Sequence, residues 1–188
     1  MRIVPLIASG LAVALAACSS PNPVLYTIAP VSGAVQSGGP KVVVLQQIST
    51  ARFLERTEIV RSSENYRLDV MSNDWWGEPL GAMVSRVLIE ELGQRLPQST
   101  VIGESGAVTA PPDATIELNL QRLDEDVSGN LILQAQASVS LKGRAAPVLR
   151  SFRFTVTPPV PGVPGEVTAI STAVGQLADG LTAMLLGR

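Results

Sequence analysis

Two segments in the C-terminal half of the chain alternate between apolar and polar side chains with a period of two. In residues 114–122 and 131–142 every second side chain is aliphatic, and most of the others are Thr, Ser, Asn or Gln. This period places the aliphatic side chains on one face of a strand, so it predicts a sheet with one buried and one solvated face. Such sheets are mostly antiparallel, and residues 128–130 (Ser-Gly-Asn) fit a hairpin turn between the two strands. Residues 149–156 add a third strand.

Two amphipathic helices are expected to cover the apolar face of this sheet. The first begins at residues 75–79, where Pro79 suits a first helical turn, and ends before Pro97, whereas the second follows Gly165. In both, the aliphatic residues recur at steps of three and four, which is typical of a helix buried on one side. These residues are Leu80, Met83, Val84, Val87, Leu88 and Leu92 in the first helix, and Val167, Ile170, Val174, Leu177, Leu181 and Met184 in the second. The predicted fold class is α+β, a single mostly antiparallel sheet with two amphipathic helices packed on one face.

Shorter apolar runs predict additional strands in the N-terminal half. They are residues 24–28, 41–45, 53–60 and 66–70. A turn at residues 61–65 joins the last two, and the glycine-rich stretch 32–40 is predicted to be a flexible loop. No internal repeat or domain boundary interrupts the pattern, so residues 24–188 are expected to form one domain.

The N-terminus has the layout of a secretory signal. Arg2 supplies a positive charge, residues 3–17 carry no charge, and small residues precede Cys18. The apolar run is shorter than the about 20 residues that a membrane-spanning helix needs. Residues 1–17 are therefore predicted to be a signal peptide that does not span the membrane.

The residues Leu15-Ala16-Ala17-Cys18 resemble the bacterial lipobox, whose cysteine becomes the acylated N-terminus of a lipoprotein. Cys18 is the only cysteine of the chain. The alternative is an ordinary cleavage site followed by a buried cysteine. Two or more acyl chains anchor a protein stably, so residues 18–23 are predicted to be a lipid-anchored linker. Ser19 is not the aspartate that marks inner-membrane retention, which implies the periplasmic face of the outer membrane.

The residue inventory argues against most enzyme chemistry. Among 188 residues there is no histidine and a single cysteine. Catalytic pairs built on histidine, histidine-ligated zinc sites and thiolate clusters are thereby excluded. The formal net charge of −2 does not suggest the basic surface that nucleic-acid binding needs. We predict a protein that is not an enzyme, uses no cofactor or metal and binds no nucleic acid.

Two features remain as candidate partner-binding residues. The first is the polar side of the predicted sheet, where only Glu117 and Lys142 interrupt uncharged side chains; it is represented by Gln134, Gln136, Ser138 and Ser140. Amide and hydroxyl groups lose water at a lower cost than charges, so this side suits a partner or a ring of like subunits. The second is Trp75-Trp76. Either one tryptophan packs in the core and the other covers a helix start, or the pair is an exposed aromatic anchor.

Taken in order, these segments resemble the ABC-type transport auxiliary lipoproteins, the PqiC-like family of Gram-negative bacteria. The resemblance lies in the lipobox at Cys18, in residues 26–28 (Tyr-Thr-Ile) and 53–60 (Phe-Leu-Glu-Arg-Thr-Glu-Ile-Val), and in residues 76–80 (Trp-Gly-Glu-Pro-Leu) leading into Val87, Leu88 and Leu92. The doubled tryptophan departs from the family pattern, which has a single one. The resemblance implies an outer-membrane lipoprotein that works with an MCE-domain, periplasm-spanning transporter subunit in lipid transport between membranes, and it implies no catalytic residues.

Two functions follow as hypotheses. The protein is either a docking or assembly component of such a transport system, with a possible homo-oligomer, or a periplasmic lipoprotein that binds a lipid or another apolar ligand between sheet and helices. Two complete apolar helix stripes would fill the apolar face of the sheet and leave little room for a ligand. The sequence therefore favours the docking component.

Overall fold

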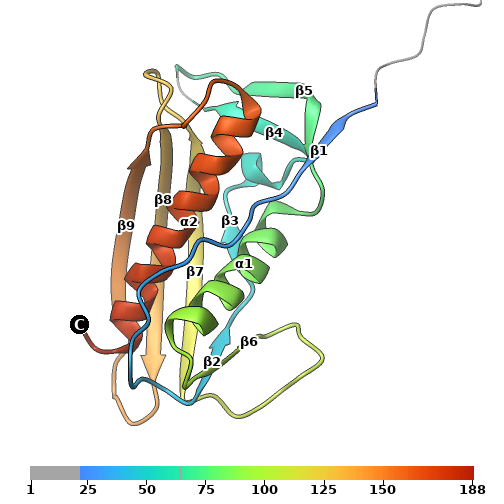
Figure 1. Cartoon of the computed structure of the whole chain (residues 1–188). Coiled ribbons are helices and arrows are strands. Elements are labelled where there is room, and N and C mark those ends of the chain that lie inside the picture. The colour runs from blue at the N-terminus through green and yellow to red at the C-terminus, as the bar shows by residue number, and fades with distance from the viewer. Residues whose placement is uncertain (1–21, 64) are drawn as a thin grey trace, which may run out of the picture.

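The structure is a computed structural model and describes residues 22–63 and 65–188. In this part of the chain, nine strands form one mixed sheet. Helices α1 (Leu80–Arg95) and α2 (Val163–Leu185) lie next to each other on one side of it (Figure 1). The strands are β1 (Val24–Tyr26), β2 (Val42–Leu45), β3 (Ser49–Thr50), β4 (Glu58–Ser62), β5 (Asp69–Trp76), β6 (Thr100–Gly103), β7 (Ala114–Glu125), β8 (Leu131–Leu141) and β9 (Val148–Val156).

The long strand β7 organises the sheet. Along one edge it pairs antiparallel with β8, which in turn pairs antiparallel with β9. Along its other edge, β7 pairs parallel with three strands in succession: its start pairs with β2, its middle with β3 and its last residue with β4. Strands β6 and β1 add further parallel pairs, with β2 and β5 respectively.

The expected fold class is therefore confirmed only in part. The protein is α+β with two helices, but its sheet is mixed and not mostly antiparallel. The prediction erred because alternation reports which face of a strand is buried, whereas it carries no information about the direction of the neighbouring strand. The antiparallel pairs are β7–β8 and β8–β9, where the two longest strands meet, and β4–β5.

The core lies between the helices and the sheet, and the predicted stripes on both helices point into it. All twelve aliphatic residues named for the two helices are buried, together with aliphatic residues from one face of β7 and β8. Phe152 of β9 stacks on Phe154 with ring centroids 5.9 Å apart. A Cβ at Gly180 of α2 would overlap the Phe152 ring, so the glycine allows helix and strand to approach closely.

The N-terminal half differs locally from the prediction. Residues 52–55 form a short 3-10 helix, η1 (Arg52–Glu55), and only the end of the predicted run 53–60 is a strand. Trp75 and Trp76 end strand β5 and do not open a helix. The short strands β3 and β6 were not predicted. Register shifts between β4 and β5 interrupt the alternation that would have identified β5 in the sequence.

Residues 27–41, here called the strap, cross the helices on the side away from the sheet and connect β1 to β2 (Figure 1). The strap has no regular secondary structure, yet it is bound along its length. The backbone N–H of Ala29 donates to Ser171 Oγ of α2 at 3.2 Å, and that of Gln36 donates to the Arg95 carbonyl oxygen at 2.7 Å. The predicted flexible loop is thus a third layer held against both helices.

Candidate functional site

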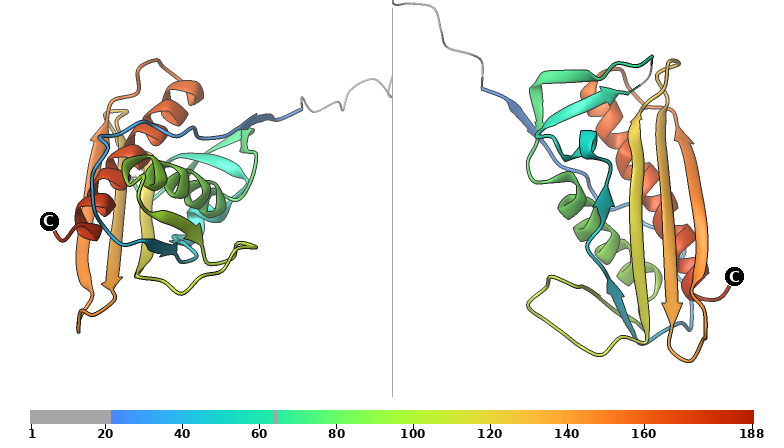
Figure 2. Two further views of the ribbon diagram at one scale, coloured as in Figure 1. Left: turned by 60° about the horizontal axis from the view of Figure 1, so that its bottom comes forward. Right: turned by 180° about the vertical axis from the view of Figure 1, so that it is seen from behind.

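The candidate partner-binding residues of β8 lie on the side of the sheet that faces away from the helices, seen from behind in Figure 2. Neighbouring strands continue this surface in register, since Asn119 of β7 lies opposite Gln136, and Gln136 lies opposite Ser151 of β9. We call the surface the polar face. Its polar side chains are Thr115, Glu117 and Asn119 of β7, Gln134, Gln136, Ser138 and Ser140 of β8, and Ser151 and Arg153 of β9, all exposed or half-buried. Exposed Leu149 of β9 lies on the same side, opposite Ser138.

Few charges lie on the polar face, and one of its amide groups is held in place. Of its nine polar side chains only Glu117 and Arg153 are charged. Arg153 Nη1 donates to Gln134 Oε1 at 3.3 Å, and Gln134 Nε2 donates to Gln121 Oε1 at 3.3 Å. Lys142, expected on this surface, lies beyond the end of β8 with its Nζ 3.7 Å from Asp113 Oδ1. Most of the polar side chains are thus neutral donors and acceptors, and Gln134 is hydrogen-bonded at both ends of its amide.

An open hollow of about 540 Å³ lies at one side of the polar face. Its lining residues are Ala51, Phe53, Ser63, Asn119, Gln121, Arg122 and Gln134. Arg122 forms an ion pair with buried Asp124. The hollow lies at a register shift between Leu120 and Arg122 of β7. The sequence signal for it is the polar pair Gln121-Arg122, which breaks the alternation and marks a bulge.

The tryptophan pair does not join this surface. Trp76 is buried and belongs to the hydrophobic core. Trp75 is half-buried, and its indole Nε1 donates to the Ser72 carbonyl oxygen at 3.0 Å. Both lie on β5, which is separated from β8 by β4 and β7. The core position of Trp76 agrees with the first alternative, in which one tryptophan packs in the core, whereas partner binding by the pair stays a prediction.

A buried polar cluster holds the strap, and we call it the strap cluster. The guanidinium of Arg95, almost fully buried, donates to Asp179 Oδ1 at 2.6 Å and to the carbonyl oxygens of Val31, Glu91 and Gly175 at 3.0–3.2 Å. Glu91 Oε1 accepts the Val31 N–H at 2.6 Å. Burial raises the pKa of Glu91 from 4.5 to about 7, against the opposing effects of the Val31 bond and the Arg95 charge.

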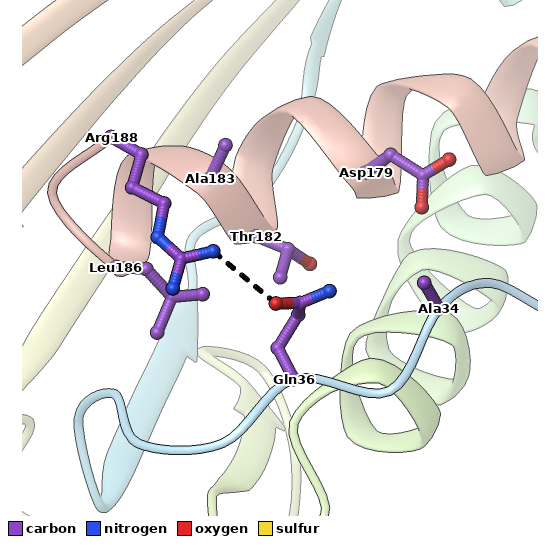
Figure 3. A pocket seen from close by; sticks show the side chains of 7 residues that line it. All are labelled: Ala34, Gln36, Asp179, Thr182, Ala183, Leu186 and Arg188. Carbon is purple, nitrogen blue, oxygen red and sulfur yellow. Dashed lines mark hydrogen bonds between the residues drawn. The ribbon is translucent and has the colours of Figure 1, made fainter.

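A pocket of about 230 Å³ lies beside this cluster, between the strap and α2. Figure 3 shows Gln36 of the strap facing Thr182 and Arg188, with Arg188 Nη1 donating to Gln36 Oε1 at 3.3 Å. Small-molecule sites usually enclose about 300–1,000 Å³. The pocket is below that range and mixes apolar and charged groups, so it lacks the character of a lipid site.

A second buried polar cluster, the acidic cluster, surrounds the start of α2. Glu166 is almost fully buried, and neither of its carboxylate oxygens has a hydrogen-bond partner within the described residues. Burial, followed by the charge of Glu125, raises its pKa from 4.5 to about 8. Glu125 itself pairs with Arg61, Nε to Oε2, at 3.1 Å. The carboxylates of Glu166 and Glu125 do not form a cation site, because no group of three His, Cys, Asp or Glu in the described residues could hold a metal ion.

Two expectations concern the membrane. Cys18, the predicted lipidation site, lies outside the described residues. Within residues 22–63 and 65–188, no helix is both long and apolar enough to cross a bilayer.

Two solved structures of other proteins have a fold similar to that of this chain. A crystal structure of an uncharacterized protein superimposes with a TM-score of 0.72 at 14% identity, covering 86% of this chain and 97% of the other. A Xanthomonas campestris protein of the DUF330 family gives a TM-score of 0.71 at 14% identity, covering 87% and 95%. At these identities the likeness concerns the fold alone. No curated protein matches the chain.

The family model of the ABC-type transport auxiliary lipoprotein component matches residues 25–181. The match extends from β1 into α2 and includes the strap and α1, and it confirms the resemblance seen in the sequence. The chain belongs to the ABC-type transport auxiliary lipoprotein component family.

Proposed function

We propose that this protein is an outer-membrane lipoprotein, anchored through Cys18 after removal of residues 1–17, that acts as a docking or assembly component of an MCE-type lipid transport system. The polar face is the observation that carries the docking role. A solvated sheet face normally bears many charges that discourage association. Here nine neighbouring side chains include only two charges, and a hollow adjoins them.

The partner that fits this surface makes a wet contact of moderate affinity. Neutral amide and hydroxyl groups cost less to desolvate than charges, and water fills hollows between polar surfaces. The face matches either the MCE-domain subunit of the transporter or a second copy of this chain. The family assignment to transport auxiliary components supports the transporter.

The docking role is tested by the double variant Gln134→Lys, Gln136→Lys. Lysine at 134 lies opposite Arg153, so the variant brings like charges together as well as placing charges in the contact. We expect about tenfold or greater weakening of assembly, which corresponds to about 1.4 kcal/mol. Crosslinking followed by identification of the MCE-domain subunit measures docking, and sedimentation velocity of the detergent-solubilised protein measures self-association.

A matched control is Gln47→Lys, Gln94→Lys, which adds the same charge at two exposed glutamines outside the polar face. It should assemble as the unmodified protein does. If the variant at 134 and 136 is folded by circular dichroism and assembles with unchanged affinity, the polar face is not the contact surface.

The anchor is tested separately with Cys18→Ser. The variant should be absent from outer-membrane vesicles after a high-salt wash, because the acyl chains that hold the protein there can no longer be attached. A variant that still floats with the vesicles would contradict the anchor. This outcome is independent of the polar face.

A further inference from the structure

Three loops leave the sheet at the same end. The last residue of β4, Ser62, lies opposite Glu125, the last residue of β7. Glu125 lies opposite Leu131, where β8 begins, and Leu131 lies opposite Val156, where β9 ends. The β4–β5 loop (residues 63–68), the β7–β8 loop (126–130) and the β9–α2 loop (157–162) therefore share one end, at the top of Figure 1. We call it the loop end.

Each of these loops exposes an apolar side chain at or near its tip. Tyr66 is fully exposed, and Val127 and Val160 are exposed by 72% and 52%. Leu68 is exposed as well. Tyr66 follows Asn65 in a turn in which both residues have positive φ, at 60° and 56°. Tyrosine is favoured at membrane surfaces because its ring is apolar and its hydroxyl is hydrated.

The loop end carries charges of both signs. Glu64 and Arg67 belong to the β4–β5 loop and Asp126 to the β7–β8 loop, whereas the β9–α2 loop, Thr-Pro-Pro-Val-Pro-Gly, carries none. Asp126 accepts the N–H groups of Ser128 and Asn130 at 2.8 and 3.0 Å, so its carboxylate is directed into its own turn. A long charged side chain such as Arg67 keeps its charged group in water at a membrane interface while its apolar stem is buried.

The N-terminal chain approaches the same end. β1 runs parallel to β5, and β5 begins at the loop end with Asp69. Followed backward from Val24, the chain therefore runs in the direction of the loop end, and Figure 1 shows the first described residues at the upper right, on the side of β5 away from the β7–β8 and β9–α2 loops. Val24 and Leu25 of β1 are themselves exposed by 53% and 64%. From Asn22 to Cys18 are four residues, a reach of at most about 14 Å.

From the loop tips and the direction of the N-terminal chain, we infer that the loop end rests on the lipid bilayer, with Tyr66, Val127 and Val160 inserted among the headgroups. The inference rests on the proposed anchor at Cys18, whose short tether holds this end near the lipid. Strands β7, β8 and β9 are then roughly perpendicular to the membrane surface. The polar face is therefore directed sideways, parallel to the membrane plane, toward neighbouring molecules. The opposite end projects away from the bilayer.

A single fluorescent label on the acylated protein tests this orientation. Acylation blocks the only native thiol, so an introduced cysteine is labelled alone. Val127→Cys probes the loop end. Val108→Cys is the matched control, because Val108 has a similar exposure of 66% and lies in a loop at the opposite end. The protein is reconstituted in vesicles of phosphatidylethanolamine and phosphatidylglycerol that contain doxyl-labelled lipid, which quenches nearby fluorophores.

The label at 127 should be quenched at least about twofold more than the label at 108, because an apolar surface enters the interface by about 5–10 Å. An eleven-residue strand such as β8 separates the two ends by about 35 Å. Tyr66→Ser and Val160→Ser together should lower the quenching at 127, whereas Val35→Ser and Leu149→Ser, two exposed residues elsewhere, should leave it unchanged.

The outcomes separate this inference from the proposed function. If the protein does not float with the vesicles, the anchor fails and with it the basis of the inference. If it floats but the label at 127 is quenched no more than the label at 108, the anchor stands and the orientation is wrong. Because the vesicles contain no other protein, quenching reports contact with lipid and not with a partner.

Discussion

The strap cluster and the acidic cluster, both buried, differ in how completely their charges are compensated. In the strap cluster, Arg95 donates to four acceptors, and only Glu91 Oε2 lacks a partner among the described residues. In the acidic cluster, Glu166 has no partner for either oxygen in that part of the chain. A buried charge stabilises a fold only where hydrogen bonds replace its lost hydration. The strap cluster therefore stabilises the bound position of the strap, whereas the acidic cluster destabilises the fold at alkaline pH.

The largest effect is expected from Arg95→Met, which removes the centre of the strap cluster. Buried Glu91 would lose its neighbouring positive charge and three backbone carbonyls would lose a donor, whereas Asp179 is exposed enough to regain water. We expect a loss of about 2–4 kcal/mol in the free energy of unfolding. Urea denaturation measures it. Hydrogen exchange should increase first in the strap, and uniform exchange would contradict the role assigned to Arg95.

A smaller loss is expected from Gly33→Ala. A Cβ at this position would overlap the guanidinium of Arg95, so strap and side chain would have to separate. Such overpacking typically costs about 1–3 kcal/mol. Gly93→Ala in α1 is the control, because its Cβ would meet no neighbouring atom and alanine favours a helix over glycine by about 1 kcal/mol. Opposite changes in melting temperature are expected for the two variants.

In the acidic cluster, Glu166→Gln should stabilise the protein at alkaline pH. The pKa of Glu166 is raised from 4.5 to about 8, so the folded protein holds this proton more tightly than the unfolded chain does. The corresponding stability is complete below about pH 4.5 and is lost as the pH rises through about 8. The variant should be more stable by at least about 1–2 kcal/mol at pH 9, because glutamine does not ionise, whereas Glu166 is then a buried carboxylate. A parallel decline of both proteins between pH 6 and 9 would contradict this.

The smallest change is expected from Glu91→Gln. The glutamine keeps an acceptor for the Val31 N–H, and it removes a carboxylate whose pKa is raised to about 7. By the same sign as for Glu166, ionisation of Glu91 costs stability as the pH rises through about 7, but its pKa is raised by less than that of Glu166. We expect a gain at pH 8 that is smaller than the gain of Glu166→Gln at pH 9, measured by urea denaturation. A larger gain would mean that the two clusters are equally strained.

The parts that could be predicted are those whose pattern is local. The stripes of α1 and α2, and the strands β7, β8 and β9, were found within a few residues of their observed bounds. The polar side of β8 was also identified correctly as facing away from the helices. The hollow was missed because Phe53 was assigned to a strand, whereas η1 brings it beside Gln121 and Arg122. The bulge next to it was visible in the sequence only as a break in alternation.

By itself, the sequence determined two helices, the buried face of β7, β8 and β9 and membership in the transport auxiliary lipoprotein family, since periodicity and residue order are properties of the chain alone. Only the tertiary structure decided that β2, β3 and β4 lie parallel along β7, that the strap is bound and that Glu166 is buried without a partner. These features depend on contacts between distant residues, such as Val31 with Glu91, 60 positions apart, and Ala29 with Ser171, 142 apart. No local pattern records which distant group a polar side chain meets, because packing of the whole chain selects it.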